Sequence, residues 1–113
     1  MSALKNKVIL IGNVGNNAEV KMLDSGKAVA RIALATNDYY KDSKGQRISE
    51  TQWHNLVIWG KQAELAQKFL LKGSEVAVEG KLVNRNYTDK EGVKRYVTEI
   101  VVSEFSLLGN RKN

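Results

Sequence analysis

The sequence has 113 residues, enough for one domain with its own hydrophobic core. It contains 18 Lys and Arg against 12 Asp and Glu, and the net charge of +6 favours a polyanionic partner, although a basic solvated surface would have the same charge. No cysteine is present, which excludes a disulfide framework, a thiol nucleophile and a cysteine-based zinc site, and fits a reducing cytoplasm. We expect neither a signal peptide nor a membrane span.

The first third of the sequence predicts three strands. Residues 5–14 hold an apolar run without alternation, so we expect this strand to be covered on both faces, by a barrel core and by a partner subunit. The run predicted to lie at the subunit interface consists of Val8, Ile9, Leu10 and Ile11. Strands over 18–23 and 27–37 are joined by a turn at Gly26, and four alanines in the latter suit a tightly curved, closed sheet.

Residues 38–50 are predicted to form a long polar loop. Loops of this length in compact domains are commonly functional. Two adjacent tyrosines, Tyr39 and Tyr40, stand here among cations, which favours a binding finger over a plain linker.

The segment 51–59 is the most informative in the chain, because its side chains alternate between two faces of a predicted strand. One face carries His54, Leu56 and Ile58, which suits a barrel core. The opposite face carries Trp53, Asn55, Val57 and Trp59. Two large rings on an open strand face of a basic protein indicate a platform on which nucleic-acid bases stack.

The remainder predicts one helix and two long strands. The helix spans 61–72, with Leu65, Ala66, Phe69 and Leu70 on its apolar face. Strands over 75–87, bent at Gly80, and over 94–108 follow, and Phe105 on the last strand is assigned to the core together with Phe69. This order predicts an all-β fold with one helix, a five-stranded Greek-key barrel of the OB type, over residues 1–109. Residues 110–113 are predicted to be a short, basic, disordered end.

Catalysis is not predicted. His54 is the only histidine and lies on the apolar face of its strand, where a packed or interface residue is the usual outcome. The ligands for a transition-metal site are too few, and no phosphate-binding loop is present. We therefore expect no enzyme, no cofactor, no metal and no catalytic residue.

A binding surface is the stronger hypothesis. The candidate stacking rings lie on strand faces opposite the apolar sets, or in the polar loop; they are Tyr40, Trp53, Trp59 and Tyr87. The cations expected to contact phosphates are Lys41, Lys44, Arg47, Lys81, Arg85 and Lys94. Some of these rings could instead seal a subunit interface.

The sequence resembles the bacterial single-stranded DNA-binding protein family over nearly its whole length. The matching segments are 6–15, 28–36, 51–54, 59–61, 63–66, 71–74 and 78–80. The resemblance implies an OB-fold, a homotetramer and a cytoplasmic, nucleoid-associated role in coating single-stranded DNA during replication, repair and recombination. The family's stacking aromatics fall on the same four rings, and Tyr40 and Tyr87 stand where many relatives carry tryptophan.

One departure limits what is carried over. The family usually continues into a flexible linker and an acidic tail that recruits other enzymes, whereas this sequence stops at a basic Gly109–Asn113. We expect either a shortened chain or a short relative, and carry over DNA binding but not tail-dependent recruitment. Two alternatives stay open: a tail-less, dimeric primosome-type adaptor that docks replication proteins, and an RNA-binding OB module.

Overall fold

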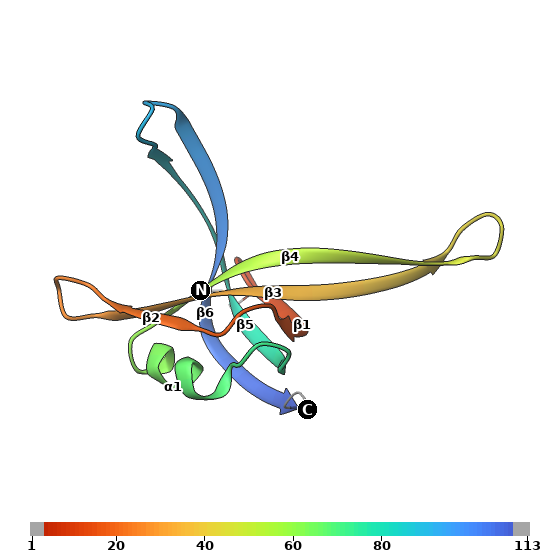
Figure 1. The fold of residues 1–113 in the computed structure, drawn as a ribbon, viewed down its shortest axis with the longest axis horizontal. Helices are drawn as coiled ribbons and strands as arrows, with labels where there is room; N and C mark the ends of the chain where they lie inside the picture. Colours follow the sequence, from red (N-terminus) through yellow and green to blue (C-terminus); the bar gives the residue numbers. More distant parts are fainter. Residues whose placement is uncertain (1–3, 110–113) are drawn as a thin grey trace.

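The computed structural model describes residues 4–109, which form six strands and one helix. In chain order they are β1 (Val8–Val14), β2 (Glu19–Met22), β3 (Ala28–Lys41), β4 (Arg47–Trp59), α1 (Lys61–Phe69), β5 (Glu75–Thr88) and β6 (Lys94–Gly109) (Figure 1).

Five of these strands close into a barrel in the order β1-β5-β6-β4-β3. The closing contact is antiparallel and places Val14 of β1 opposite Leu34 of β3. β6 runs parallel to β4, with Leu56 opposite Ile100, and β2 pairs with β3 outside the closed ring. A five-stranded closed barrel with a helix between β4 and β5 is the OB-fold, so the predicted fold is confirmed.

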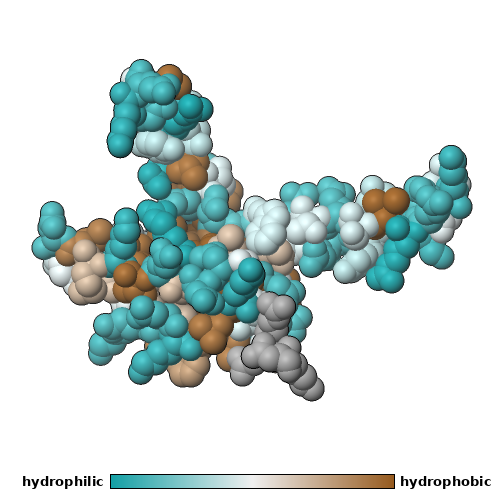
Figure 2. Space-filling view, in the orientation of Figure 1, coloured by the Kyte–Doolittle hydropathy of each residue, from teal (hydrophilic) through white to brown (hydrophobic). Residues whose placement is uncertain are grey.

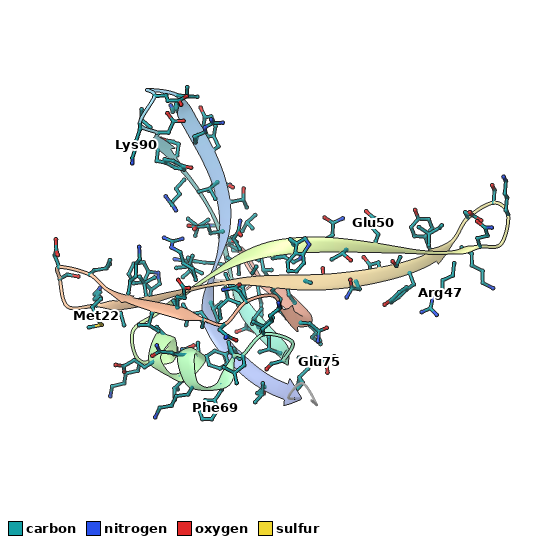
Figure 3. All side chains as sticks on the ribbon, viewed as in Figure 1. Met22, Arg47, Glu50, Phe69, Glu75 and Lys90 are labelled. Atoms are coloured by element: carbon teal, nitrogen blue, oxygen red, sulfur yellow. The ribbon has the colours of Figure 1, made fainter. Side chains whose placement is uncertain are left out.

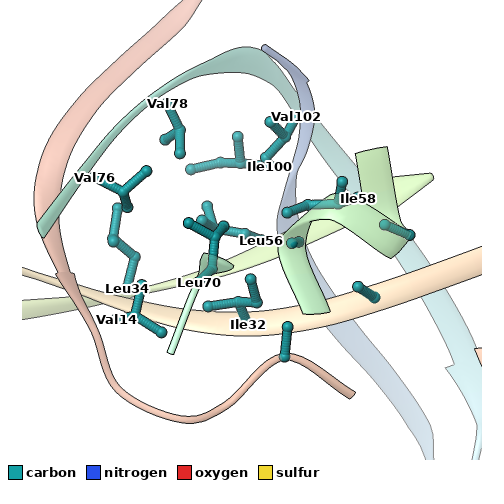
Figure 4. Packing of buried hydrophobic residues seen from close by; sticks show 14 of the residues in the cluster. Val14, Ile32, Leu34, Leu56, Ile58, Leu70, Val76, Val78, Ile100 and Val102 are labelled. Carbon is teal, nitrogen blue, oxygen red and sulfur yellow. The ribbon is translucent and has the colours of Figure 1, made fainter. Parts of the chain in front are cut away.

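The core fills the barrel and extends under α1. Period-two alternation turns branched aliphatic side chains inward from every barrel strand (Figure 4). The largest fully buried apolar side chains are Leu34, Leu56, Ile58, Leu70, Val76 and Val78. Each such side chain stabilises the fold by about 1.5–3 kcal/mol relative to an exposed one.

Gly80 marks the bend that the sequence predicted in β5. The pairing of β5 with β6 shifts register between Glu79 and Gly80, as at a β-bulge. A Cβ atom at Gly80 would lie 2.3 Å from the Val101 carbonyl oxygen, so the two strands approach too closely there for any side chain.

The predicted loop over residues 38–50 is wrong. β3 and β4 continue as a paired hairpin through Tyr40 opposite Ile48 and Lys41 opposite Arg47. The turn is short, and the Asp42 carboxylate accepts hydrogen bonds from the backbone N–H groups of Lys44 and Gln46, both at 2.9 Å. Both faces of the outer half of this hairpin are exposed to solvent. Its strands therefore lack the alternation of apolar and polar residues that identifies a strand in a sequence.

The predicted helix is also too long, and its predicted apolar face is only half right, because Ala66 and Leu70 are buried but Leu65 and Phe69 are exposed. α1 ends at Phe69, and its buried side chains are Ala63 and Ala66, with Leu70 buried just beyond. Phe69 is 48% exposed and points away from the barrel (Figure 3), so its assignment to the core is wrong. Small alanines face the barrel because the helix packs closely against it. Phe105, in contrast, is partly buried against the core, in line with its assignment.

Two hairpins extend well beyond the barrel, β3–β4 in one direction and β5–β6 in another (Figure 1). Among residues 4–109, no helix has the length and apolarity required to cross a bilayer. The predicted basic end at 110–113 lies outside the described residues.

Candidate nucleic-acid interface

One continuous surface carries most of the predicted binding residues. It is the outward side of β5, β6, β4 and β3, which we call the open face. The ladder places Trp53 opposite Ala35, and Val57 opposite both Arg31 of β3 and Val101 of β6. These pairings put the outward side chains of four strands on one sheet surface.

Trp53 lies on the open face where β4 leaves the barrel. Its side chain is 62% exposed although it is one of the largest in the chain. The ring lies over Gly15: a Cβ atom there would be 2.5 Å from Trp53 Cζ3. Ala35, directly opposite Trp53, is also small. Small residues beneath the indole let it lie low against the sheet with its outer surface open to a ligand.

Trp59 lies on the same face at the other end of the strand, opposite Val29. The two tryptophans are six positions apart in sequence, which corresponds to roughly 20 Å along β4. Val57, which the alternation placed on the open face, is buried because it sits in the middle of the sheet between strands β3 and β6.

A buried carboxylate joins three strands at the centre of the open face. Glu99 of β6 accepts hydrogen bonds from Arg85 Nε at 2.8 Å and Arg85 Nη2 at 3.3 Å, and also from Arg31 Nη1. Hydrogen bonding from Arg85, reinforced by Arg31, lowers the pKa of Glu99 against the opposing effect of burial. Two arginines facing one carboxylate leave a net positive charge, and each guanidinium stays partly exposed.

Tyr87 extends the open face onto the β5–β6 hairpin. The guanidinium carbon of Arg85 lies 5.9 Å from the centre of the Tyr87 ring, within the range of a cation–π contact. Arg31, Asn55, Arg85 and Tyr87 line one shallow pocket with Glu99, so the two hairpins share a single surface at their base.

Seven of the ten predicted contact residues share the open face: Lys41, Arg47, Trp53, Trp59, Lys81, Arg85 and Tyr87. Lys44 lies in the β3–β4 turn. Tyr40 and Lys94 lie on the reverse faces of their hairpins, since Tyr40 pairs with Ile48 and Lys94 with Thr88. These two do not join the others on one surface.

Several open-face residues were absent from the predicted set: Tyr39, Arg31, Asn55 and Glu99. Alternation had already placed Asn55 on this face, although not among the expected contacts, and it could have placed Arg31 there too, because Arg31 sits between the inward-facing Ala30 and Ile32. Glu99 has no such signal, because its partners come from strands distant in sequence.

His54 behaves as a packed polar residue. Its Nε2 is 3.0 Å from Thr36 Oγ1, and its side chain is half-buried on the core side of β4. Over residues 4–109, no group of three or more His, Cys, Asp or Glu side chains is arranged to hold a metal ion.

The outer side of β1 carries a second exposed surface. Ile9 is 63% exposed and Ile11 is 58% exposed. Val8 and Leu10 alternate with them and pack against the barrel core. Of the four residues predicted to contact a partner subunit, only the two isoleucines are therefore available to one.

An OB-fold barrel whose outward face combines exposed aromatic rings with arginines and lysines is typical of the nucleic-acid-binding class of proteins. Residues 5–108 match the single-strand binding protein family. The chain belongs to this family, as the resemblance indicated. The family is described by a binding role, which agrees with the prediction that the chain is not an enzyme.

Individual relatives agree. Two proteins named single-stranded DNA-binding protein, from Xanthomonas campestris pv. campestris and Xanthomonas axonopodis pv. citri, are each 45% identical over 106 residues and 94% of this chain. The chain spans 62% and 59% of their lengths.

Among solved structures, the Plasmodium falciparum SSB complex with ssDNA superposes with a TM-score of 0.84 at 32% identity, covering 96% of this chain and 98% of that one. A deletion mutant of the single-stranded DNA binding protein from Thermus aquaticus gives a TM-score of 0.79 at 29% identity, covering 94% and 51%.

Proposed function

We propose that the chain binds single-stranded DNA without sequence preference and coats it during replication, repair and recombination, in the cytoplasm and in association with nucleoid DNA. The observation that carries this proposal is the open face, on which exposed aromatic rings alternate with cations around Trp53. The two Xanthomonas relatives and the solved complex with ssDNA support the choice of ligand.

Binding on this face has two physical components. The excess of cations attracts the phosphate backbone and releases its counterions. Bases then stack on Trp53, Trp59 and Tyr87, each of which contributes about 1–3 kcal/mol for any base. Because stacking uses the π-face that all bases share, the component that holds the bases carries little sequence information.

The reverse faces of the hairpins are a separate part of the proposal. A DNA strand that runs from the open face to Tyr40 or Lys94 has to pass around the edge of a protein hairpin. We propose that both residues serve DNA leaving the open face, and that Lys44 in the turn contacts phosphate at that crossing.

We also propose that the chain forms a homo-oligomer, most simply a tetramer, through β1. Ile9 and Ile11 place two β-branched apolar side chains side by side on an outward strand surface, and such a surface is normally covered.

Quenching of the intrinsic tryptophan fluorescence tests the proposed function. Thymidine oligonucleotides of increasing length, at low and high salt, are titrated into the protein with duplex DNA and a matched uridine RNA as controls. We expect quenching that grows with length, favours single-stranded DNA and weakens with salt. An equal response to duplex, or none, would favour the adaptor; stronger quenching by RNA would favour an RNA-binding module.

A further inference from the structure

We propose that Tyr39, together with Arg47, forms an additional base-stacking site on the β3–β4 hairpin, so that the DNA track continues outward from Trp53 along one face of the hairpin. This inference rests on the proposed function and adds a site to it.

The register of the hairpin places Tyr39 on the open face. Tyr39 pairs with Ser49 and Ala35 pairs with Trp53, within a ladder that has no register shift. Ser49 and Trp53 are four residues apart on β4, and residues an even number apart share a face. Tyr39 therefore points to the same side as Trp53, about 14 Å further along the hairpin.

Side-chain contacts confirm this assignment of faces. The Thr51 hydroxyl donates a hydrogen bond to Asn37 Oδ1 at 2.6 Å, on the rung between Trp53 and Tyr39. On the reverse face, Gln52 Nε2 donates to Glu50 Oε1 at 3.0 Å. Arg47 and Glu50 also lie on opposite sides of the hairpin (Figure 3).

The Tyr39 ring contacts Arg47 on one side and remains largely exposed to solvent. The guanidinium carbon of Arg47 lies 4.3 Å from the ring centre, close enough for a strong cation–π contact that covers one side of the ring. The side chain is nevertheless 57% exposed. Tyr39, Lys41 and Arg47 line a shallow pocket near the end of the hairpin, shared with Tyr40.

The chemistry of this pocket fits a nucleotide. A base stacks on the uncovered side of the Tyr39 ring, which Arg47 keeps from rotating. The same guanidinium has further N–H groups with which to bind a phosphate oxygen. Lys41, which pairs with Arg47 on the same face of the hairpin, supplies a second cation. The space-filling view shows the hairpin projecting away from the barrel, with mostly hydrophilic residues on the side in view (Figure 2).

The test compares Tyr39→Ala, Tyr39→Phe and Trp53→Ala with the unmodified chain. Affinity is measured by anisotropy of labelled thymidine oligonucleotides, in a short and a long series, and folding is checked by circular dichroism melting. We expect Tyr39→Ala to weaken binding of long oligonucleotides at least about fivefold, which corresponds to the lower end of one stacked base. Tyr39→Phe keeps the ring and is expected to bind within about twofold of the unmodified chain. Oligonucleotides too short to extend beyond Trp53 are expected to bind Tyr39→Ala normally.

Photo-cross-linking separates the two adjacent tyrosines. A 5-iodouracil base cross-links to the ring on which it stacks, and peptide mapping then distinguishes Tyr39 from Tyr40. We expect cross-links at Tyr39 and Trp53 in the same complex.

Two results would overturn the inference. The first is unchanged long-oligonucleotide affinity in Tyr39→Ala while Trp53→Ala loses affinity, which leaves the proposed function standing. The second is an equal loss in Tyr39→Phe and Tyr39→Ala. If the unmodified chain fails to bind any single-stranded oligonucleotide, the proposed function and the inference fail together.

Discussion

The indole of Trp53 lies directly over Gly15, which belongs to the segment that follows β1 and is 38 positions earlier in the chain. The Gly15 N–H donates to the Ala33 carbonyl oxygen at 2.8 Å, so the backbone of this glycine is held against β3 beneath the ring. The exposed ring can therefore lie in this orientation only because position 15 carries no side chain.

Gly15→Ala is expected to weaken DNA binding several-fold with little loss of stability. The added methyl would meet the far end of an exposed ring, which can swing away at low cost but then no longer lies in place for a base. Affinity and thermal melting measure the two effects. In a double-mutant cycle, Gly15→Ala is expected to change binding no further once Trp53→Ala is present. A full additional loss in that background would contradict the proposed link.

Trp53→Ala is expected to weaken binding by about 1–3 kcal/mol, because one stacked base is lost. The free energy of unfolding is expected to change by less than about 1 kcal/mol, since most of the ring is exposed. Fluorescence anisotropy and denaturant unfolding give the two values. Equal losses of stability and affinity would instead show that the ring is structural.

Lys81→Ala is expected to make the dependence of log K on log salt shallower by about 0.7, the value for one phosphate contact on a single strand. The matched control is Lys68→Ala, in the last turn of α1, which lies off the open face. Titrations at several salt concentrations measure both slopes. The same change in both variants would mean that Lys81 acts only through net charge.

Stability is expected to fall in acid through Glu99. Its pKa lies below the ordinary 4.5 in the folded chain, because Arg85 and Arg31 bond the charged form. The folded state therefore binds fewer protons than the unfolded state, so the stabilisation is present above pH 4.5 and is lost as pH falls through the lowered pKa.

Glu99→Gln is expected to cost about 1–2 kcal/mol at neutral pH, because the charge-assisted hydrogen bonds from Arg85 and Arg31 are weakened. The cost is expected to stay this small because the partly exposed arginines regain hydration. Denaturant unfolding from pH 3 to 7, a range of about 4 units around the carboxyl pKa, is expected to show a weaker acid dependence in this variant. An unchanged pH profile would show that Glu99 contributes nothing to it.

Ile9→Glu combined with Ile11→Glu is expected to reduce the mass of the assembly measured by light scattering, toward the 12.6 kDa of one chain. Charges at these positions would have to be buried in the proposed β1 interface. Leu65→Glu, at an exposed apolar position on α1, is the control and is expected to leave the mass unchanged. A mass unaffected by the β1 substitutions would place the interface elsewhere.

Within the barrel, local patterns predicted the structure well. Within the barrel, a strand such as β4 has one face toward solvent and one face toward the core. The alternation of its residues therefore predicted both the strand and the face on which Trp53 and Trp59 lie. The bend at Gly80 was likewise visible, because a glycine within a strand marks a close approach of backbones.

Beyond the barrel, the same reasoning failed for a physical reason. The outer half of the β3–β4 hairpin is exposed on both faces, so its sequence carries no periodic signal and resembles a loop. Without the register, Tyr39 and Tyr40 could not be assigned to opposite faces. In the helix, an apolar side chain wrongly indicated burial. Phe69 was predicted to lie in the core, but α1 packs against the barrel through Ala63 and Ala66 and leaves Phe69 exposed.

The sequence by itself determined the barrel, its single helix, the basic character of the chain and the tryptophans of the open face, because each of these depends on alternation or composition along one segment. Only the tertiary structure decided which rings share a surface, where Gly15 supports Trp53, and how Glu99 holds Arg31 and Arg85. Those relationships join strands that are far apart in the chain, and no local pattern encodes the register and curvature that bring them together.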